Sequence, residues 1–299
     1  MTDLADYDHL EPRTFGGMPP VSFDEARVVL LPIPLDRTTS YVPGTRYGPR
    51  EILNASVQTE LWDEELGLDF SDVGILTLPE MGLPFADQAQ SIAEIERVAS
   101  RLVARDKFLI ALGGEHSVTP PLVKATVERY PGTSVLQIDA HADLRESYLG
   151  SPHSHACAMR RALAYARCTQ VGIRSISQAE SAAVPGLATT IFYDVSMRDD
   201  PRWIDRVVDT LADTVYITID CDGLDPAVMP AVGTPEPGGL SWHELLALLR
   251  AVFSRRRVVG ADLVELCPIP GMVAPNLLAA RTVFKLVAYS ATSGGRTAV

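Results

Sequence analysis

Residues 139–143, Asp-Ala-His-Ala-Asp, place three potential metal ligands at alternate positions directly after an apolar run, Val-Leu-Gln-Ile. In a regular strand these side chains would share one face, and the outer two would stand roughly 13 Å apart at about 3.3 Å per residue. That separation is too large for a single ion. If Asp139, His141 and Asp143 are ligands, the strand must end near Asp139 and the chain must curl around the bound group.

Further candidate ligands follow other apolar runs: His116 in Gly-Gly-Glu-His-Ser, and Asp220 and Asp222 in Asp-Cys-Asp-Gly-Leu-Asp-Pro. The six candidates comprise two imidazoles and four carboxylates, a set that suits Mn²⁺ and, less exclusively, Co²⁺, Fe²⁺, Ni²⁺ or Zn²⁺. One divalent ion would leave two of the four carboxylate charges uncompensated, whereas two ions make the set neutral. Two metals would also activate water between them by lowering its pKa. The residues therefore predict a two-metal site.

Each motif also has an ordinary interpretation when it is taken alone. The segment 139–143 is a polar loop, His116 is a buried histidine with satisfied hydrogen bonds, and Asp220 and Asp222 cap a turn. Asp225, in the same turn, receives only that structural interpretation. Four of the six histidines fall within 116–155 beside clustered aspartates, and this combination favours metal binding over the separate interpretations.

The elements that must position these residues are apolar runs of strand length. They occupy residues 26–35, 107–114, 133–140, 168–174, 189–195, 214–222 and 256–266, and helix-like segments lie at 89–106, 120–130 and 241–256. Ser241 and Glu244 form a capping-box pattern at the start of the last helix. Continuous apolar strands that alternate with helices predict a mostly parallel sheet covered on both faces. The polar motifs then lie at the carboxyl ends of strands, where such sheets bind ligands.

Composition limits the class of protein. The 299 residues are 46% apolar, with no repeat or linker, and predict a single domain over 1–299 with an N-terminal extension at 1–25. The net charge of −12 argues against a nucleic acid or an anionic membrane as partner, and it suits a small cationic substrate. The acidic N-terminus, the lack of an 18-residue apolar run and the small number of cysteines predict a cytoplasmic protein.

Five segments in this order resemble the ureohydrolases, the family of arginases and agmatinases: 113–117, 139–143, 154–161, 220–240 and 260–268. The resemblance runs from residues 42–50 to about residue 290, and Thr-Pro-Glu-Pro-Gly-Gly-Leu (234–240) is similar to the agmatinase branch. It implies a three-layer αβα fold around an eight-stranded, mostly parallel sheet. It also implies two Mn²⁺ ions per chain, hydrolysis of a guanidinium group to urea and an amine, and a homotrimer or homohexamer.

The resemblance also implies roles for individual residues. One metal would be held by His116, Asp139, Asp143 and Asp220, and the other by Asp139, His141, Asp220 and Asp222. Glu265 matches the family's guanidinium-binding glutamate and His155 its proton-shuttle histidine, while Asp143 would pass a proton towards the departing amine. Glu146 and Tyr148 are candidates for the distal ammonium because they lie in the loop between Asp143 and His155.

The expected substrate is agmatine, which gives urea and putrescine in polyamine biosynthesis. N1-aminopropylagmatine is the alternative, because the loop 154–161 also resembles enzymes that act on it. Guanidinobutyrate and formimidoylglutamate are disfavoured because Arg145 and Arg160 are the only candidate partners for their carboxylates, and we expect Arg145 to pair with Glu146. Residues 143–157 also lack the Asn and Ser arrangement that arginases use to hold the α-carboxylate, which disfavours arginine.

Three other classes compete with a ureohydrolase. A single-zinc deacetylase on a related fold would not need the full ligand set or Glu265. A binuclear phosphoesterase is disfavoured by the acidity of the chain. A non-catalytic relative that keeps the fold is disfavoured because all six ligands, His155 and Glu265 are present.

Overall fold

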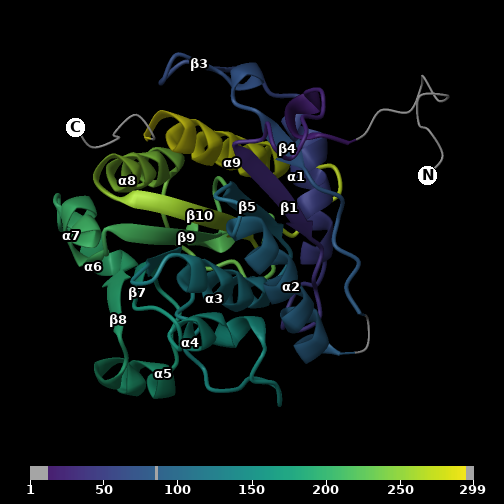
Figure 1. Cartoon of the computed structure of the whole chain (residues 1–299). Helices are drawn as coiled ribbons and strands as arrows, with labels where there is room; N and C mark the ends of the chain where they lie inside the picture. Colours follow the sequence, from purple (N-terminus) through teal and green to yellow (C-terminus); the bar gives the residue numbers. More distant parts are fainter. Residues whose placement is uncertain (1–12, 85–86, 294–299) are drawn as a thin grey trace.

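The computed structural model describes residues 13–84 and 87–293 and contains an eight-stranded sheet in the order β4-β1-β5-β10-β9-β6-β7-β8 (Figure 1). Every pair of neighbouring strands in this sheet is parallel. The strands are β1 (Val28–Ile33), β4 (Ile75–Thr77), β5 (Phe108–Gly113), β6 (Ser134–Ile138), β7 (Cys168–Ile173), β8 (Thr189–Tyr193), β9 (Thr214–Asp220) and β10 (Arg257–Val264).

Helices cover both faces of the sheet, as the continuous apolar strands predict. In β1, Val28 and Leu30 pack into one core while Val29 and Leu31 pack into the other, because successive side chains point to opposite faces. One face is covered by α1 (Gly48–Ser56), α7 (Trp203–Thr210), α8 (Trp242–Arg255) and α9 (Ala274–Ser293), and the other by α2 (Gln88–Val103), α3 (Thr119–Arg129) and α4 (Ala158–Ala162) (Figure 1). The expected three-layer αβα fold is confirmed.

The seven strand-like runs of the sequence correspond to seven strands of this sheet, and the three predicted helices to α2, α3 and α8. The capping box of α8 is also confirmed, since Ser241 Oγ accepts the Glu244 N–H at 3.2 Å and Glu244 Oε2 accepts the Ser241 N–H at 2.8 Å. The sequence patterns did not predict β4, the antiparallel hairpin of β2 (Trp62–Asp63) and β3 (Leu68–Asp69), or the helices α1, α4, α5 (Gln178–Ala183), α6 (Asp194–Arg198), α7 and α9.

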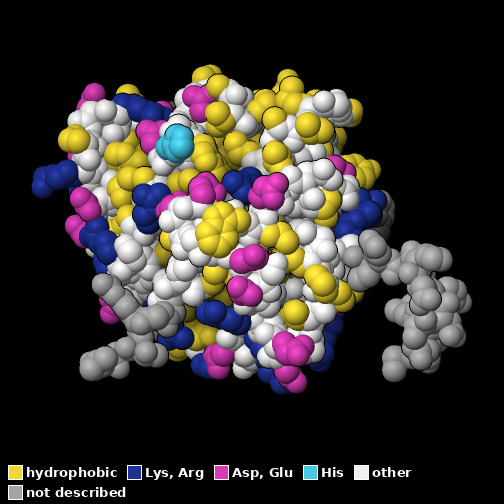
Figure 2. Space-filling view, turned by 90° about the horizontal axis from the view of Figure 1, so that it is seen from above, with side chains coloured by type: hydrophobic (Ala, Val, Ile, Leu, Met, Phe, Trp, Pro, Cys, Tyr) yellow, Lys and Arg dark blue, Asp and Glu magenta, His cyan; other side chains and the backbone are white. Residues whose placement is uncertain are grey.

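Seen from above, over the hairpin and α9, the molecule carries acidic, basic and apolar side chains interspersed with one another (Figure 2). The buried Lys285 of α9 pairs there with Asp63 at 2.7 Å and Glu65 at 3.0 Å, which fastens the hairpin to the helix layer. Within residues 13–84 and 87–293, no helix has both the length and the apolar character needed to cross a bilayer.

The predicted N-terminal extension, 1–25, is described only in part, because residues 1–12 lie outside the described residues. The described part packs on the domain: Phe15 is buried, and its ring centroid lies 4.3 Å from that of Phe284 in α9. This contact places residues 13–18 beside the helix layer.

We predict that Gly223→Ala lowers the free energy of unfolding by about 1–3 kcal/mol, the typical effect of overpacking a core. A Cβ at residue 223 would lie 2.7 Å from the Asp139 nitrogen and 2.9 Å from the Ile138 carbonyl carbon, and neither backbone atom can move away cheaply. Gly186→Ala is the matched control, because a Cβ there meets nothing within 4 Å; it should stay within about 0.5 kcal/mol of the parent chain. Urea unfolding measures both variants, and equal midpoints for them would contradict the close approach.

Candidate metal centre

Strand order brings the polar motifs to one place. β5, β10, β9 and β6 are consecutive in the sheet, although they are far apart in the chain. His116 follows β5, Glu265 follows β10, Asp220 ends β9 and Asp139 follows β6. Because the carboxyl ends of parallel strands meet at the same edge, these four side chains converge there.

The chain curls after each aspartate-bearing strand, as the alternating ligand pattern requires. β6 ends at Ile138, and Asp139 Oδ1 then accepts the His141 N–H at 2.6 Å. In the same way, Asp220 Oδ1 accepts the Asp222 N–H at 2.9 Å. An aspartate that bonds to the backbone two residues ahead turns the chain sharply, so alternate side chains converge instead of running along a strand.

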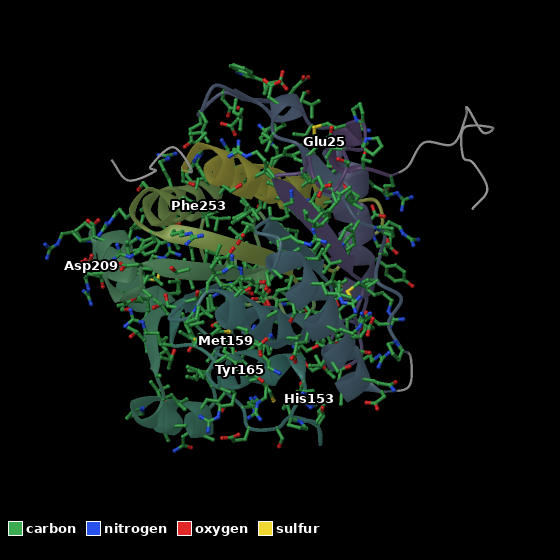
Figure 3. All side chains as sticks on the ribbon, viewed as in Figure 1. Glu25, His153, Met159, Tyr165, Asp209 and Phe253 are labelled. Atoms are coloured by element: carbon green, nitrogen blue, oxygen red, sulfur yellow. The ribbon has the colours of Figure 1, made fainter. Side chains whose placement is uncertain are left out.

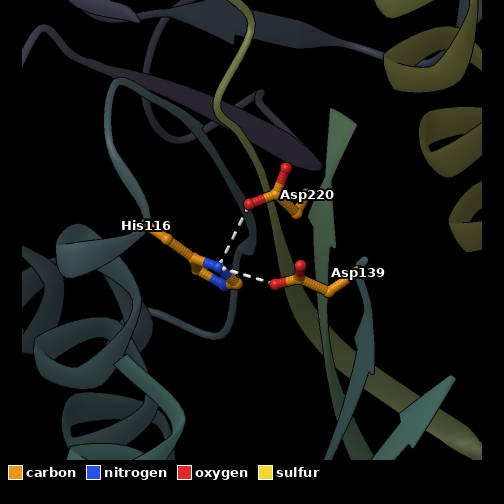
Figure 4. A group of neighbouring side chains, drawn as sticks. All are labelled: His116, Asp139 and Asp220. Atoms are coloured by element: carbon orange, nitrogen blue, oxygen red, sulfur yellow. Dashed lines mark ion pairs between the residues drawn. The ribbon is translucent and has the colours of Figure 1, made fainter. Parts of the chain in front are cut away.

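The ligand atoms form two groups that share Asp139. His116 Nδ1 lies 3.1 Å from Asp139 Oδ2, 3.2 Å from Asp143 Oδ2 and 3.3 Å from Asp220 Oδ2, and Figure 4 shows the imidazole pointing between two of these carboxylates. His141 Nδ1 lies 3.0 Å from Asp222 Oδ2 and 3.6 Å from Asp139 Oδ1. The groups His116–Asp139–Asp220 and Asp139–His141–Asp222 each bring their ligand atoms within 4.8 Å of one another. All six predicted ligands therefore lie together.

Charge is crowded in this cluster. Burial raises the pKa of Asp220 well above its ordinary value, and the charges of Asp222 and Asp139 raise it further. Burial opposes protonation of His116, but the neighbouring carboxylates of Asp139, Asp143 and Asp220 raise its pKa well above the usual range. So many buried carboxylates are stable together only when positive charge lies among them.

The donor set fits two hard divalent ions. Within the described residues, His116 Nδ1 is a buried nitrogen that makes no hydrogen bond, although it faces three carboxylates. Four carboxylates and two imidazoles supply oxygen-rich sites, and two divalent ions would balance the four negative charges.

Glu265 and His155 lie beside this cluster. Glu265 Oε1 accepts the His116 N–H at 2.7 Å, and His155 Nδ1 lies 3.8 Å from the same oxygen. Burial raises the pKa of Glu265 well above its usual value, and the charges of Glu115 and Asp222 act in the same direction. Glu265 and Asp143 both have positive φ angles, 63° and 52°, which are uncommon for residues other than glycine and are concentrated at functional sites.

A cavity of about 180 Å³ opens beside the cluster. It is lined by Ser40, His141, Asp143, Arg145, Tyr148, His155, Ser175, Ser177, Glu180 and Thr234, among others. The Tyr148 ring stands edge-on to His155, with the ring centroids 6.5 Å apart. The expected pairing of Arg145 with Glu146 is wrong: Arg145 Nε lies 3.7 Å from Glu180 Oε2, and its guanidinium lies 4.9 Å from the centroid of the Tyr148 ring.

Glu146 does not line this cavity. Its carboxylate pairs with Arg160 and Arg161, the latter at 2.8 Å, and its side chain is 67% exposed. It borders a separate cavity of about 540 Å³, together with His153 and Tyr165, which Figure 3 labels in that part of the molecule. Of the two residues predicted for the distal ammonium, the structure thus brings only Tyr148 to the site.

Sequence reasoning missed the residues that hold the His155 loop. The buried Glu115 accepts the backbone N–H groups of Arg37 and Thr38 at 2.5 and 2.6 Å. Thr38 Oγ1 donates to Glu115 at 2.8 Å and accepts the His155 N–H at 2.9 Å. The glutamate of Gly-Gly-Glu-His-Ser was visible in the sequence, but no local pattern pointed to Thr38.

Comparison with known proteins gives concordant matches. The sequence model of the arginase family matches residues 26–288. The chain is similar to the N(1)-aminopropylagmatine ureohydrolase of Synechocystis sp., with 40% identity over 90% of each protein, and to the agmatinase of Bacillus cereus, with 38% identity over 83% of this chain and 86% of that protein. Its fold is similar to the crystal structure of the agmatine ureohydrolase of Thermoplasma volcanium, with a TM-score of 0.88, 31% identity and complete coverage of both chains.

We predict that Asp220→Asn fails to retain two divalent ions after gel filtration, because it weakens a carboxylate at the centre of the cluster. Asp225→Asn is the matched control, since Asp225 Oδ1 accepts the Ala227 N–H at 2.8 Å and an amide oxygen can do the same. Elemental analysis counts the ions in each purified variant. An Asp220→Asn preparation that holds as many ions as the parent chain would contradict its assignment as a ligand.

Proposed function

This chain belongs to the arginase family, and we propose that it releases urea from the guanidinium group of N1-aminopropylagmatine, with agmatine as the second candidate substrate. It is an agmatinase-type ureohydrolase, a hydrolase of linear amidines. The observation that carries the proposal is the buried Glu265 carboxylate, which lies between the ligand cluster and His155 and offers a partner for a planar cation.

Two Mn²⁺ ions, held by His116, Asp139, His141, Asp143, Asp220 and Asp222, would supply a water nucleophile at neutral pH when bound. The chain's own residues then orient the substrate and move protons. Glu265 would hold the guanidinium through charge-assisted hydrogen bonds, which fixes the plane of the reacting carbon. The Glu265 Oε1 accepts a hydrogen bond from the backbone N–H of His116, which fixes the position of the carboxylate.

Proton movement falls to Asp143 and His155. Both line the cavity, and Asp143 Oδ2 lies within the ligand cluster, where it can hold a proton destined for the departing amine. Within the described residues, His155 Nε2 is buried and makes no hydrogen bond, so it is free to exchange a proton with a bound substrate or water. Histidine is the side chain best suited to such exchange near neutral pH.

The far end of the cavity suits an amine better than a carboxylate. Arg145 is the only lysine or arginine among the described residues that line it, and it is already paired with Glu180 and stacked on Tyr148. An arginine substrate would therefore bury its α-carboxylate without a free cation. Tyr148, Ser40 and Thr234 offer hydroxyl oxygens to an ammonium group, which agrees with the net charge of −12.

Similarity to two N(1)-aminopropylagmatine ureohydrolases supports N1-aminopropylagmatine as the first candidate. Relatives named N(1)-aminopropylagmatine ureohydrolase from Synechocystis and Thermus thermophilus are 40% and 38% identical and match 90% and 91% of this chain. The agmatinase of Bacillus cereus is 38% identical and matches 83% of this chain, and that of Pyrococcus horikoshii matches 92% of it at 32% identity. Both substrates present the same guanidinium to Glu265 and lack an α-carboxylate.

We predict that kcat/KM for aminopropylagmatine or agmatine exceeds that for arginine by roughly a thousandfold, because an unpaired buried carboxylate costs several kcal/mol. A urea-release assay with Mn²⁺ over aminopropylagmatine, agmatine, arginine and guanidinobutyrate measures this. A preference for arginine would overturn the substrate proposal but leave the metal chemistry intact. A higher value for agmatine than for its aminopropyl derivative would exchange the first and second candidates.

We also predict that Glu265→Gln retains both ions but loses at least about a hundredfold in kcat/KM, since it removes a preorganised charge from the reacting group. Glu244→Gln, at the exposed cap of α8, is the control and should retain full activity. Metal content and urea release are measured on the same preparations. Wild-type kinetics in Glu265→Gln would refute its assignment to the guanidinium.

A further inference from the structure

A buried polar network stands behind His116, on the side away from the carboxylate cluster. Thr218 and Tyr216 of β9, Asp262 of β10 and Thr119 at the start of α3 are all at most 2% exposed. Asp262 Oδ1 accepts the Thr218 hydroxyl at 2.5 Å, and Oδ2 accepts Tyr216 at 2.8 Å and Thr119 at 3.0 Å. Three donors thus fix the orientation of one carboxylate in the core of the sheet.

The direction of these hydrogen bonds determines which nitrogen of the His116 imidazole carries the hydrogen. Thr218 Oγ1 lies 3.0 Å from His116 Nε2 and also 3.3 Å from Thr119 Oγ1. A hydroxyl has one hydrogen, and that of Thr218 is directed to Asp262. Thr218 must therefore accept the Nε2–H of His116. In the neutral imidazole, the form that can bind a metal, the lone pair then lies on Nδ1, the nitrogen that faces Asp139, Asp143 and Asp220.

We propose that Thr218 and Asp262 are positioning residues. They hold the His116 imidazole so that its Nδ1 can bind the metal of the His116–Asp139–Asp220 group. A metal-bound histidine is commonly oriented by a carboxylate at its other nitrogen; here a threonine hydroxyl relays that carboxylate. The proposal rests on the proposed two-metal centre. It explains why a carboxylate is placed inside the sheet, where an apolar residue would be buried at lower free-energy cost.

The second histidine has a different support. His141 is 24% exposed in its side chain, and its Nε2 lies 3.9 Å from the carboxylate of Glu236, which is itself 37% exposed. The two groups therefore differ: His116 is held rigidly by buried partners, and His141 faces a partner at the surface. A change at Thr218 should weaken one metal site and leave the other nearly unaffected, which gives the experiment an internal reference.

The test is a Mn²⁺ titration of the metal-stripped full-length chain, followed by the electron paramagnetic resonance signal of free Mn²⁺. Thr218→Val keeps the side-chain shape but removes the hydroxyl; we expect one of the two sites to weaken by about 10–100-fold while the other is retained. Thr218→Ser restores the hydroxyl and should restore the affinity. Thr126→Val is the matched control, because Thr126 is also buried but its hydroxyl, among the described residues, bonds only to the Leu122 carbonyl within its helix.

Urea release gives a second measurement. Thr218→Val should regain most of its activity in excess Mn²⁺, since the defect lies in metal occupancy. Wild-type Mn²⁺ affinity at both sites in folded Thr218→Val would overturn the proposal, and so would an equal loss in Thr126→Val. If Thr218→Val does not melt cooperatively, Thr218→Ala and Asp262→Asn are titrated instead against the same two outcomes. A parent chain that binds two Mn²⁺ but releases no urea would refute the proposed function and leave this proposal standing.

Discussion

The structure of the site depends on the placement of like charges where water cannot screen them. Asp139, Asp220 and Asp222 are at most 3% exposed, and two such charges about 4 Å apart repel by roughly 4 kcal/mol at an effective dielectric constant of 20. The sheet imposes this crowding, since β6 and β9 are hydrogen-bonded neighbours whose carboxyl ends both carry aspartates. The same backbone turns that gather the carboxylates also satisfy part of their hydrogen-bonding capacity. Cations that balance the remaining charge therefore contribute to the stability of the fold as well as to its chemistry.

Sequence reasoning succeeded where a local pattern reports directly on structure. The long apolar strands and the capping box of α8 are such patterns, and so are the aspartates and histidines at strand ends. It failed for β4, because three residues at a sheet edge carry too little periodicity. It also failed for the 20-residue helix α9, which buries residues on nearly all sides, including Lys285, and so lacks a clean amphipathic stripe. In both cases tertiary packing determines the element.

The candidate site divides in the same way. The chemical types and the spacing of the six predicted ligands are local properties, so they could be recognised before the fold was known. The supports of the site are not local. Thr38 and His155 are 117 positions apart in the chain, and Thr218 and His116 are 102 positions apart. A short sequence motif therefore cannot reveal either contact. The partner of Arg145 was likewise set by the fold, because Glu180 comes from a helix that the sequence patterns did not predict.

The residues at the strand ends and the residues in the loops also have different roles in the site. His116 and the two residues behind it, Thr218 of β9 and Asp262 of β10, are buried at strands whose spacing is fixed by the sheet, so the geometry at the reacting end tolerates little change. The residues around the mouth, Ser40, Tyr148 and Thr234, come from loops, which accept substitution more readily. A relative can therefore retain the sheet and its ligands while altering the loops that meet the far end of the substrate. On this argument, the reaction is determined by the strand ends of the chain, and the choice among guanidino substrates is determined by loop residues that a shared fold leaves free to vary.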